Sequence, residues 1–216
     1  MMKKIVNISF IRKLLPQQSR KEVHDYWKSP PDSQYNSPEA YLKSNTKNTQ
    51  ILVDIVNQYF NDKNINILEL GSNVGRNLNR LYQDGFKNLN AIELNSDAIR
   101  LMEKSFPKTF SSTKIFECAI EDKIKEFTDK EFDLVFSMAV LMHIHRDSEW
   151  IFEHIVRITK RYLIIMEHEK GVARKNFPRN YKTIFEKLGL KQIDSFNLDK
   201  GYTCRIFSRE TPYLHM

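Results

Sequence analysis

The chain has 216 residues, 41% hydrophobic content and a formal net charge of +7. This is enough for one large domain with a buried core, and the 14 Phe and 9 Tyr exclude a wholly disordered chain. No apolar run approaches the roughly 20 residues that span a bilayer. Residues 1–10 lack the clean apolar stretch of a signal peptide, so we expect a cytoplasmic protein.

The positive charge is concentrated near the N-terminus. Residues 1–50 carry nine Lys or Arg and four Asp or Glu, a net of +5, and the segment is polar and rich in proline. We therefore predict a basic extension over 1–45, followed by one domain over 46–216. The extension could meet nucleic acid, an anionic membrane or an anionic substrate, or it could be a solvated segment. Its aromatic side chains suit either a lid over a substrate or helices packed on the core; they are His24, Tyr26, Trp27, Tyr35 and Tyr41.

Hydrophobic periodicity predicts alternating strands and helices after residue 46. The predicted helices are 20–28, 38–44, 46–60, 75–84, 96–106, 147–159 and 181–188. The predicted strands are 65–70, 89–93, 113–118, 132–137, 162–167, 190–198 and 202–208. The alternation favours a parallel sheet with helices on both faces, and the short turn at 199–201 makes the last two strands antiparallel. We predict an α/β, Rossmann-like, doubly wound, seven-stranded sheet that ends in an antiparallel hairpin.

The first strand of this series ends in a candidate ligand-binding loop, Glu69-Leu70-Gly71. In open α/β sheets, ligands bind outside the carboxyl ends of the strands, where a helix N-terminus presents free N–H groups. Gly71 permits a tight turn, and Asn73 tolerates the left-handed conformation. The pattern Glu-x-Gly-x-Asn-x-Gly is not the dinucleotide fingerprint, which disfavours a nicotinamide dehydrogenase. Alone, the loop is equally consistent with a purely structural turn.

The second strand ends in Glu93, 24 positions after Glu69. A carboxylate at this place of a βαβ unit can accept hydrogen bonds from both hydroxyls of a ribose. The alternative is a solvated loop acid, which the apolar residues before Glu93 disfavour.

Four segments resemble motifs of the class I S-adenosylmethionine-dependent methyltransferases, in the same order and spacing. They are residues 67–77 (ILELGSNVGRN), 91–95 (AIELN), 118–122 (CAIED) and 132–145 (FDLVFSMAVLMHIH). The resemblance covers about residues 46–210 and implies S-adenosyl-L-methionine as methyl donor, with S-adenosyl-L-homocysteine as product. It is greatest to enzymes that methylate a hydroxyl, amine or carboxyl of a small-molecule or saccharide-like acceptor.

The resemblance also implies the donor site. Glu69 would orient the first loop or reach the methionine amino group, and Glu93 would bind the ribose. The backbone N–H of Ile120 would donate to the adenine, and Glu121 would accept a hydrogen bond from the exocyclic amine of the adenine. The other implied residues wrap the methionine and ribose or line the sulfonium side: Gly71, Ser72, Asn73, Gly75, Ser137 and Met138. The family usually has glycine at the place of Asn73, so this side chain departs from the pattern.

A hydroxyl or amine acceptor must lose a proton, so a general base is useful. We expect it after the fourth or fifth strand, where His143, His145 and Glu167 stand. Histidine titrates near neutral pH, which suits a base, although the alternative for His143 is to pack the loop under the donor. The His-x-His pair lacks a fuller ligand motif, so we expect no metal.

The segment 176–181 (NFPRNY) combines aromatic, basic and amide groups, which suits recognition of a polar substrate. The alternative is an ordinary loop in which Asn180 caps the next helix. We predict substrate contacts at His168, Arg179 and Tyr181. Deletion of residues 1–44 is expected to spare donor binding and to impair acceptor binding.

Two other functions compete with a small-molecule methyltransferase. The basic extension suggests an RNA methyltransferase, but the Asn/Asp-Pro-Pro-Tyr/Phe motif of exocyclic-amine methylation is missing after the fourth strand. Nucleic acid is therefore a possible partner that we do not favour. A non-catalytic module that binds the donor is the other alternative, because residues for binding do not prove turnover.

Overall fold

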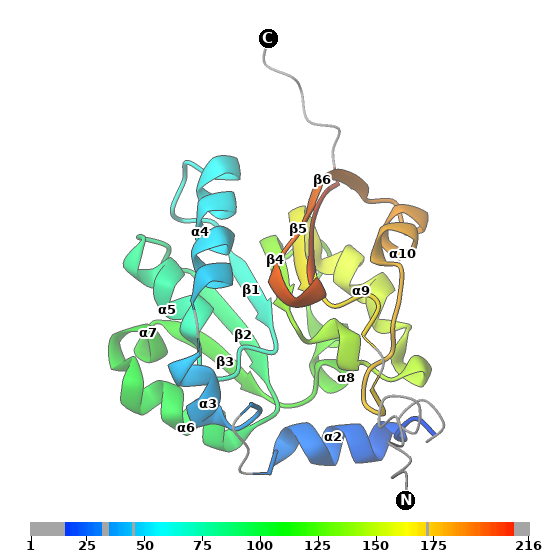
Figure 1. Ribbon diagram of the computed structural model, residues 1–216. Coiled ribbons are helices and arrows are strands. Elements are labelled where there is room, and N and C mark those ends of the chain that lie inside the picture. The colour runs from blue at the N-terminus through cyan, green and yellow to red at the C-terminus, as the bar shows by residue number, and fades with distance from the viewer. Residues whose placement is uncertain (1–15, 32–34, 45, 172, 210–216) are drawn as a thin grey trace, which may run out of the picture.

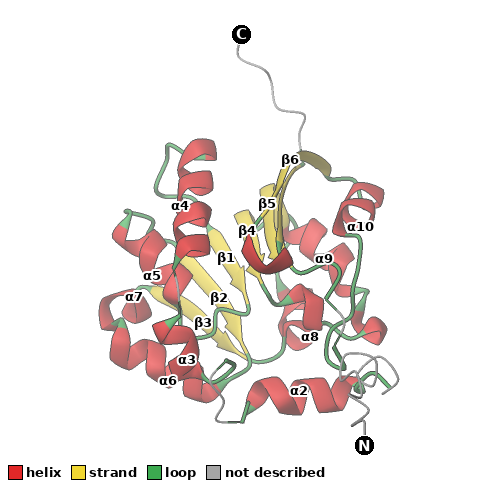
Figure 2. Cartoon of the chain, viewed as in Figure 1, coloured by secondary structure: helices red, strands yellow, loops and turns green. Residues whose placement is uncertain are grey.

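The computed structural model describes residues 16–31, 35–44, 46–171 and 173–209. Its centre is a seven-stranded sheet in the order β3-β2-β1-β4-β5-β7-β6 (Figure 1). The strands are β1 Ile67–Leu70, β2 Leu89–Glu93, β3 Thr113–Glu117, β4 Phe132–Met138, β5 Thr159–Glu167, β6 Lys191–Asn197 and β7 Thr203–Ser208. Strands β1 to β5 pair in parallel, and β7 is antiparallel to both β5 and β6. The predicted α/β, Rossmann-like fold with a C-terminal hairpin is confirmed (Figure 2).

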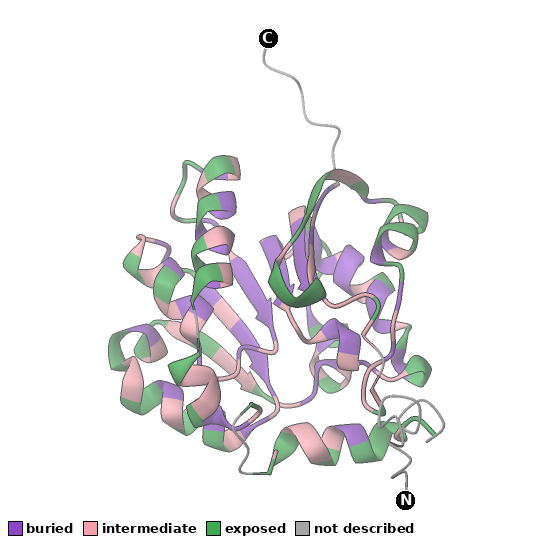
Figure 3. Cartoon of the chain, in the orientation of Figure 1, coloured by how far each residue is buried: buried purple, intermediate pink, exposed green. Residues whose placement is uncertain are grey.

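Helices cover both faces of this sheet. They are α2 Arg20–Lys28, α3 Pro38–Lys43, α4 Lys47–Tyr59, α5 Arg76–Gln83, α6 Ser96–Ser105, α7 Pro107–Ser111, α8 Ile120–Lys123, α9 Ile151–Ile158 and α10 Tyr181–Lys187. Helices α4 to α7 lie on one face, and α8 to α10 lie on the other (Figure 1). Each face has its own cluster of buried hydrophobic side chains, and the buried residues concentrate on the strands between them (Figure 3). Burial on both faces explains the continuous apolar runs of β1 and β4.

The largest error in the predicted elements concerns the helix after β4. The helix expected over 147–159 begins at Ile151, and a separate 3₁₀ turn, Arg146–Ser148, precedes it. Asp147 and Ser148 do not cap α9, because they lie in this separate turn and Trp150 occupies the N-cap position. Thr159 belongs to β5, where it pairs with Phe132. Helices α7 and α8 were not predicted as separate elements.

The N-terminal segment, residues 16–44, which we call the arm, lies along the carboxyl ends of the strands (Figure 1). A capping box between Ser19 and Glu22 begins α2. The backbone N–H of Gln18 donates to the carbonyl of Arg174 at 2.8 Å, so the arm docks on the loop that follows β5. Residues 1–15, with four of the basic residues of the predicted extension, lie outside the described residues. Within the described ranges, no helix is long and apolar enough to cross a membrane.

Candidate functional site

Two adjoining cavities lie at the carboxyl ends of β1, β2 and β4. The smaller cavity encloses about 120 Å³ and the larger about 440 Å³. Five residues line both cavities, and we call them the junction: Tyr41, Gly71, Asn73, Met138 and Ala139. The predicted position of the ligand site, at the ends of the first strands, thus coincides with the two cavities.

The smaller cavity lies between the arm and the loops after β2 and β3. Glu93 and the segment 118–121 form one wall, and Val23, His24 and Trp27 of α2 cover them. Nε2 of His24 lies 3.1 Å from Oε1 of Glu121, so an ion pair fastens the arm to this wall. The bond to Glu121 raises the pKa of His24. Burial tends to raise the pKa of Glu121, but the bond from His24 and further hydrogen bonds together lower it.

The turn after β1 is built around Glu93. One carboxylate oxygen of Glu93 accepts the backbone N–H of Asn73 at 2.6 Å, and the other accepts that of Asn95 at 2.8 Å. Burial raises the pKa of Glu93, while these backbone bonds oppose the rise. Asn73 has φ +47°, which confirms the left-handed conformation expected for it. At Gly71, also left-handed, an added Cβ would lie 2.5 Å from Cγ2 of Val140, so only glycine permits this close approach.

Glu69 supplies an incompletely satisfied carboxyl group to the larger cavity. Its side chain is fully buried, and Oε1 accepts a hydrogen bond from Nδ2 of Asn77 at 2.8 Å. The hydroxyl of Thr49 donates to the other end of the Asn77 amide at 2.6 Å and fixes it. Oε2 of Glu69 and Oγ of Ser72 are buried without a partner among the described residues. Burial raises the pKa of Glu69 to about 8. A positively charged group bound in this cavity would favour the carboxylate and give its free oxygen a hydrogen-bond partner.

Glu167 differs from the expected base. It is fully buried and accepts four hydrogen bonds, from Oγ of Ser137 at 2.7 Å and from the backbone N–H groups of Val140, Leu141 and Met142 at 3.0–3.1 Å. Neither Glu167 nor Ser137 lines a cavity. The carboxylate therefore shapes the loop after β4 from behind, and the geometry does not fit a general base.

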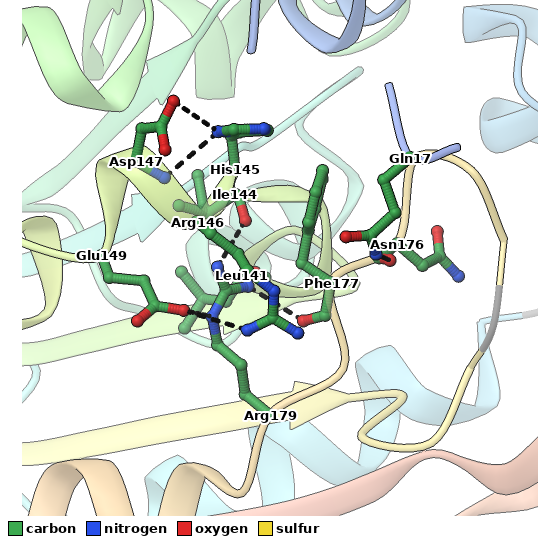
Figure 4. A network of polar contacts seen from close by, with 10 residues as sticks. All are labelled: Gln17, Leu141, Ile144, His145, Arg146, Asp147, Glu149, Asn176, Phe177 and Arg179. Carbon is green, nitrogen blue, oxygen red and sulfur yellow. Dashed lines mark hydrogen bonds and ion pairs between the residues drawn. The ribbon is translucent and has the colours of Figure 1, made fainter. Parts of the chain in front are cut away.

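The two histidines after β4 have different surroundings. Nδ1 of His143 donates to the carbonyl of Lys175 at 2.9 Å, which leaves Nε2 unprotonated, and the ring packs on Trp27 in the wall of the smaller cavity. Burial lowers the pKa of His143 to about 4. His145 lies outside both cavities, where Nδ1 accepts the N–H of Asp147 and the ring packs on Phe177 (Figure 4). Of the two, only His143 is placed to contact a bound molecule.

The predicted substrate contacts do not line either cavity. Arg179 is buried and donates to the carbonyls of Phe177 and Ile144 at 2.9 and 2.7 Å and to Glu149 at 2.9 Å (Figure 4). The guanidinium therefore holds the loop after β4 in place through bonds within the protein, rather than facing either cavity.

Tyr181 and His168, the other two predicted substrate contacts, also lie outside both cavities. Tyr181 is fully buried against Phe152 and Phe185, and His168 packs on Tyr202 behind the rim of the larger cavity. Asn180 accepts the N–H of Thr183 and caps α10, which agrees with the alternative of an ordinary loop before a capped helix.

Most of the implied donor-site residues do line the cavities: Glu69, Gly71, Ser72, Asn73, Glu93, Ile120, Glu121 and Met138. Gly75 lies behind them as the left-handed residue that begins α5, packed against Met102. The contribution of the arm was indicated only in general terms, by its aromatic residues Trp27 and Tyr41. Arg76, which lines the larger cavity from the first turn of α5, carried no signal of its own.

The comparisons with known proteins agree with this geometry. Residues 68–165 match the family model described as a methyltransferase domain. Magnesium protoporphyrin IX methyltransferase from Synechocystis, with bound S-adenosylhomocysteine, is similar over 89% of this chain and 100% of that chain, at a TM-score of 0.70 and 13% identity. The Burkholderia thailandensis 1,6-didemethyltoxoflavin-N1-methyltransferase is similar over 90% of this chain and 92% of that chain, at a TM-score of 0.68 and 13% identity. A methyltransferase from Aquifex aeolicus is similar over 81% of this chain and 99% of that chain, at a TM-score of 0.60 and 18% identity. No curated protein sequence matches significantly.

Residues 68–165 thus match a methyltransferase domain, and the described chain shares the fold of methyltransferases of known structure. S-adenosylmethionine is the molecule bound in one of the similar structures, a magnesium protoporphyrin IX methyltransferase that is 15% identical to this chain. The residues present suit this donor, because the unpartnered Oε2 of Glu69 can accept from an ammonium group and the carboxylate of Glu93 lines the adjoining cavity.

Proposed function

We propose that the enzyme transfers a methyl group to an oxygen or nitrogen of a small, polar, saccharide-like acceptor bound in the larger cavity. The observation that carries this proposal is the chemistry of the cavity wall away from the junction. It consists of tyrosine rings, amides and charged groups: Tyr35, Asn36, Ser44, Lys47, Asn48, Asp199, Lys200 and Tyr202. Aromatic faces beside hydrogen-bonding side chains suit an acceptor that carries hydroxyl groups.

The donor would lie across the two cavities. The adenosine end fits the smaller cavity, with its ribose beside Glu93 and its adenine beside Ile120 and Glu121. The amino acid end fits the larger cavity, beside Glu69 and Ser72. When bound, the donor supplies an activated methyl group, and the protein orients the acceptor and excludes water.

A small acceptor is favoured over RNA by the position of the arm. Helix α2 covers the smaller cavity, and the residues that follow it, Tyr35, Asn36 and Tyr41, line the larger one. A polymer would have to displace these contacts. Two similar structures are named for small-molecule substrates, a magnesium porphyrin and a toxoflavin precursor, which supports an acceptor of this size. We accordingly propose residues 1–45 as a lid and 46–216 as the methyltransferase domain.

His143 lines the smaller cavity, and we propose that it receives the acceptor proton when the acceptor reaches from the larger cavity across the junction. The tautomer of His143 is fixed by the bond to Lys175, so Nε2 carries a lone pair, and the residue lines the smaller cavity. Because the pKa of His143 is lowered to about 4, the ring stays unprotonated throughout the neutral range. Rate should therefore not fall as the pH decreases from 8 to 6, as it would with a base of ordinary histidine pKa.

The test has two parts. A labelled-methyl transfer assay against fractionated cell extract identifies the acceptor, and a salt-dependent gel shift with RNA tests the alternative. His143→Asn is then expected to lower kcat about 100-fold with little change in donor affinity, while the matched His145→Asn retains activity. Transfer only to RNA would contradict a small acceptor, and full activity of His143→Asn would remove His143 from proton transfer.

A further inference from the structure

Tyr41 occupies a distinctive place in the site, because it is the arm residue that lines both cavities. The sulfur of S-adenosylmethionine connects the ribose to the amino acid chain. If the ribose lies beside Glu93 and the amino acid beside Glu69, the positive sulfur lies at the junction, where the cavities meet. Tyr41 is the aromatic residue of the junction; the others are Gly71, Asn73, Met138 and Ala139.

Arg76 holds Tyr41 in this place. One guanidinium nitrogen, Nη1, donates to the backbone carbonyls of Tyr41 at 2.6 Å and of Ser44 at 3.1 Å, and also contacts the Ser44 hydroxyl. These carbonyls form the C-terminal end of α3, where a cation is favoured. Arg76 follows Gly75 in the first turn of α5, so the arm is fastened directly to the donor-binding loop.

Two other residues of the junction, Ala139 and Asn73, have an unusual backbone conformation. Ala139 has φ +59°, a conformation that is unfavourable for a residue with a Cβ, and its N–H donates to the carbonyl of Met166 at 2.9 Å. Asn73 has φ +47° and is held by Glu93. Two non-glycine residues in the left-handed conformation therefore line the junction together with Tyr41.

We propose that Tyr41 is a positioning residue that recognises the positive sulfonium of the donor through its ring, and that Arg76 fixes the ring for this purpose. A cation is attracted to the face of an aromatic ring, most strongly where water is excluded. Burial raises the pKa of Tyr41 to about 12, so the phenol stays neutral and offers its ring without a competing charge. Glu69 and Glu93 lie in the two cavities on either side, and the donor charge falls between them. The inference rests on the proposed placement of the donor and is independent of the acceptor.

The test compares S-adenosylmethionine with S-adenosylhomocysteine, which lacks the methyl group and the positive charge. Calorimetry without acceptor gives both dissociation constants. Tyr41→Ala is expected to weaken S-adenosylmethionine binding at least 10-fold, about 1.4 kcal/mol, and S-adenosylhomocysteine binding less than 3-fold. Tyr41→Phe keeps the ring and should keep the ratio of the two constants. Tyr82→Ala, on α5 but outside both cavities, is the matched control.

Arg76 is tested by a double-variant cycle. Arg76→Lys should lower the preference for S-adenosylmethionine over S-adenosylhomocysteine. In combination with Tyr41→Ala it should lower this preference no further, because both changes act through one ring. Arg80→Lys, one turn along α5 and exposed, is the control. If Tyr41→Ala does not fold, Tyr41→Leu, which keeps apolar bulk without a ring, carries the same expectation.

Two results would overturn the proposal. Equal weakening of both ligands by Tyr41→Ala would make Tyr41 a cover for the cavity rather than a group that recognises charge. A wild-type protein that binds neither ligand, or whose Glu93→Ala variant binds both normally, would show that the donor placement itself is wrong. A failure of the acceptor assignment alone would leave both affinities unchanged.

Discussion

The ends of β1 and β5 each carry a fully buried glutamate, yet the two carboxylates have opposite surroundings. Glu167, the last residue of β5, accepts four hydrogen bonds from Ser137 of β4 and from the loop that follows β4. Glu69, in β1, lines the larger cavity and accepts one hydrogen bond, and its second oxygen is buried without a partner among the described residues. A satisfied buried carboxylate stabilises the fold, whereas an unsatisfied one beside a cavity indicates where a ligand completes the structure. The comparison predicts that the two residues respond oppositely to substitution.

Glu167→Ala should give the largest loss of stability. It leaves the Ser137 hydroxyl and three backbone N–H groups without their acceptor, which is expected to cost about 3 to 5 kcal/mol in the free energy of unfolding. Urea unfolding measures this loss, with the exposed Glu186→Ala as control. A loss below about 1 kcal/mol would mean that the loop after β4 does not depend on Glu167.

Glu69→Gln should leave stability unchanged or raise it, because glutamine resembles the protonated acid and removes the cost of burying a charge. Donor affinity should fall about 10- to 100-fold, since the charged acceptor for the amino group is lost. Calorimetry with S-adenosylhomocysteine, which retains the amino group, measures it. A destabilised variant with normal affinity would reverse the contrast with Glu167.

The raised pKa of Glu69, to about 8, sharpens the same contrast through pH. Folded protein binds a proton here that unfolded protein releases above about pH 4.5, so this contribution to stability is present below that pH and is lost as the pH rises to about 8. An ammonium group favours the carboxylate, so donor binding at pH 7 should release a proton. Calorimetry in buffers of different ionisation enthalpy detects that release, and Glu69→Gln should abolish it.

His24→Ala should have the smallest effect. Its pair with Glu121 is partly exposed, so we expect about a 3-fold loss of donor affinity. The pKa of His24 is raised, so the pair contributes fully below the usual histidine value near 6.5 and is lost as the pH rises through the raised value. The difference between wild type and variant should therefore be larger at pH 6 than at pH 9. Lys21→Ala, on the same helix, serves as control, and a difference that does not change with pH would argue against the pair.

The strand ends could be predicted from the sequence because they depend on neighbouring residues. The apolar run, Gly71 and the left-handed Asn73 determine the turn after β1 locally. The roles of Glu69 and Glu167 could not be separated in this way, because the partners of Glu167 lie 25 to 30 positions earlier in the chain. Arg179 and Tyr181 were assigned to a substrate since their side chains suit recognition, but tertiary packing buries both.

The arm was the least predictable part of the site. Its aromatic residues were compatible with a lid or with core packing, and nothing in the sequence placed α2 against the loop of Glu121. Because Val23, His24 and Trp27 line the smaller cavity, deletion of residues 1–44 should weaken donor binding, contrary to the expectation from the sequence. The donor and acceptor ends of the site therefore share one cover.

The docking of the arm has a consequence for synthesis on the ribosome. Gln17 and Gln18 are among the earlier residues to be translated, yet they bond to Asn176 and Arg174, which emerge more than 150 residues later. At about 5 to 20 residues per second, the ribosome delays these contacts by roughly 10 to 30 seconds. Late in that interval the nascent chain already contains the residues that line the smaller cavity, but the start of the arm is not yet fastened to the loop after β5.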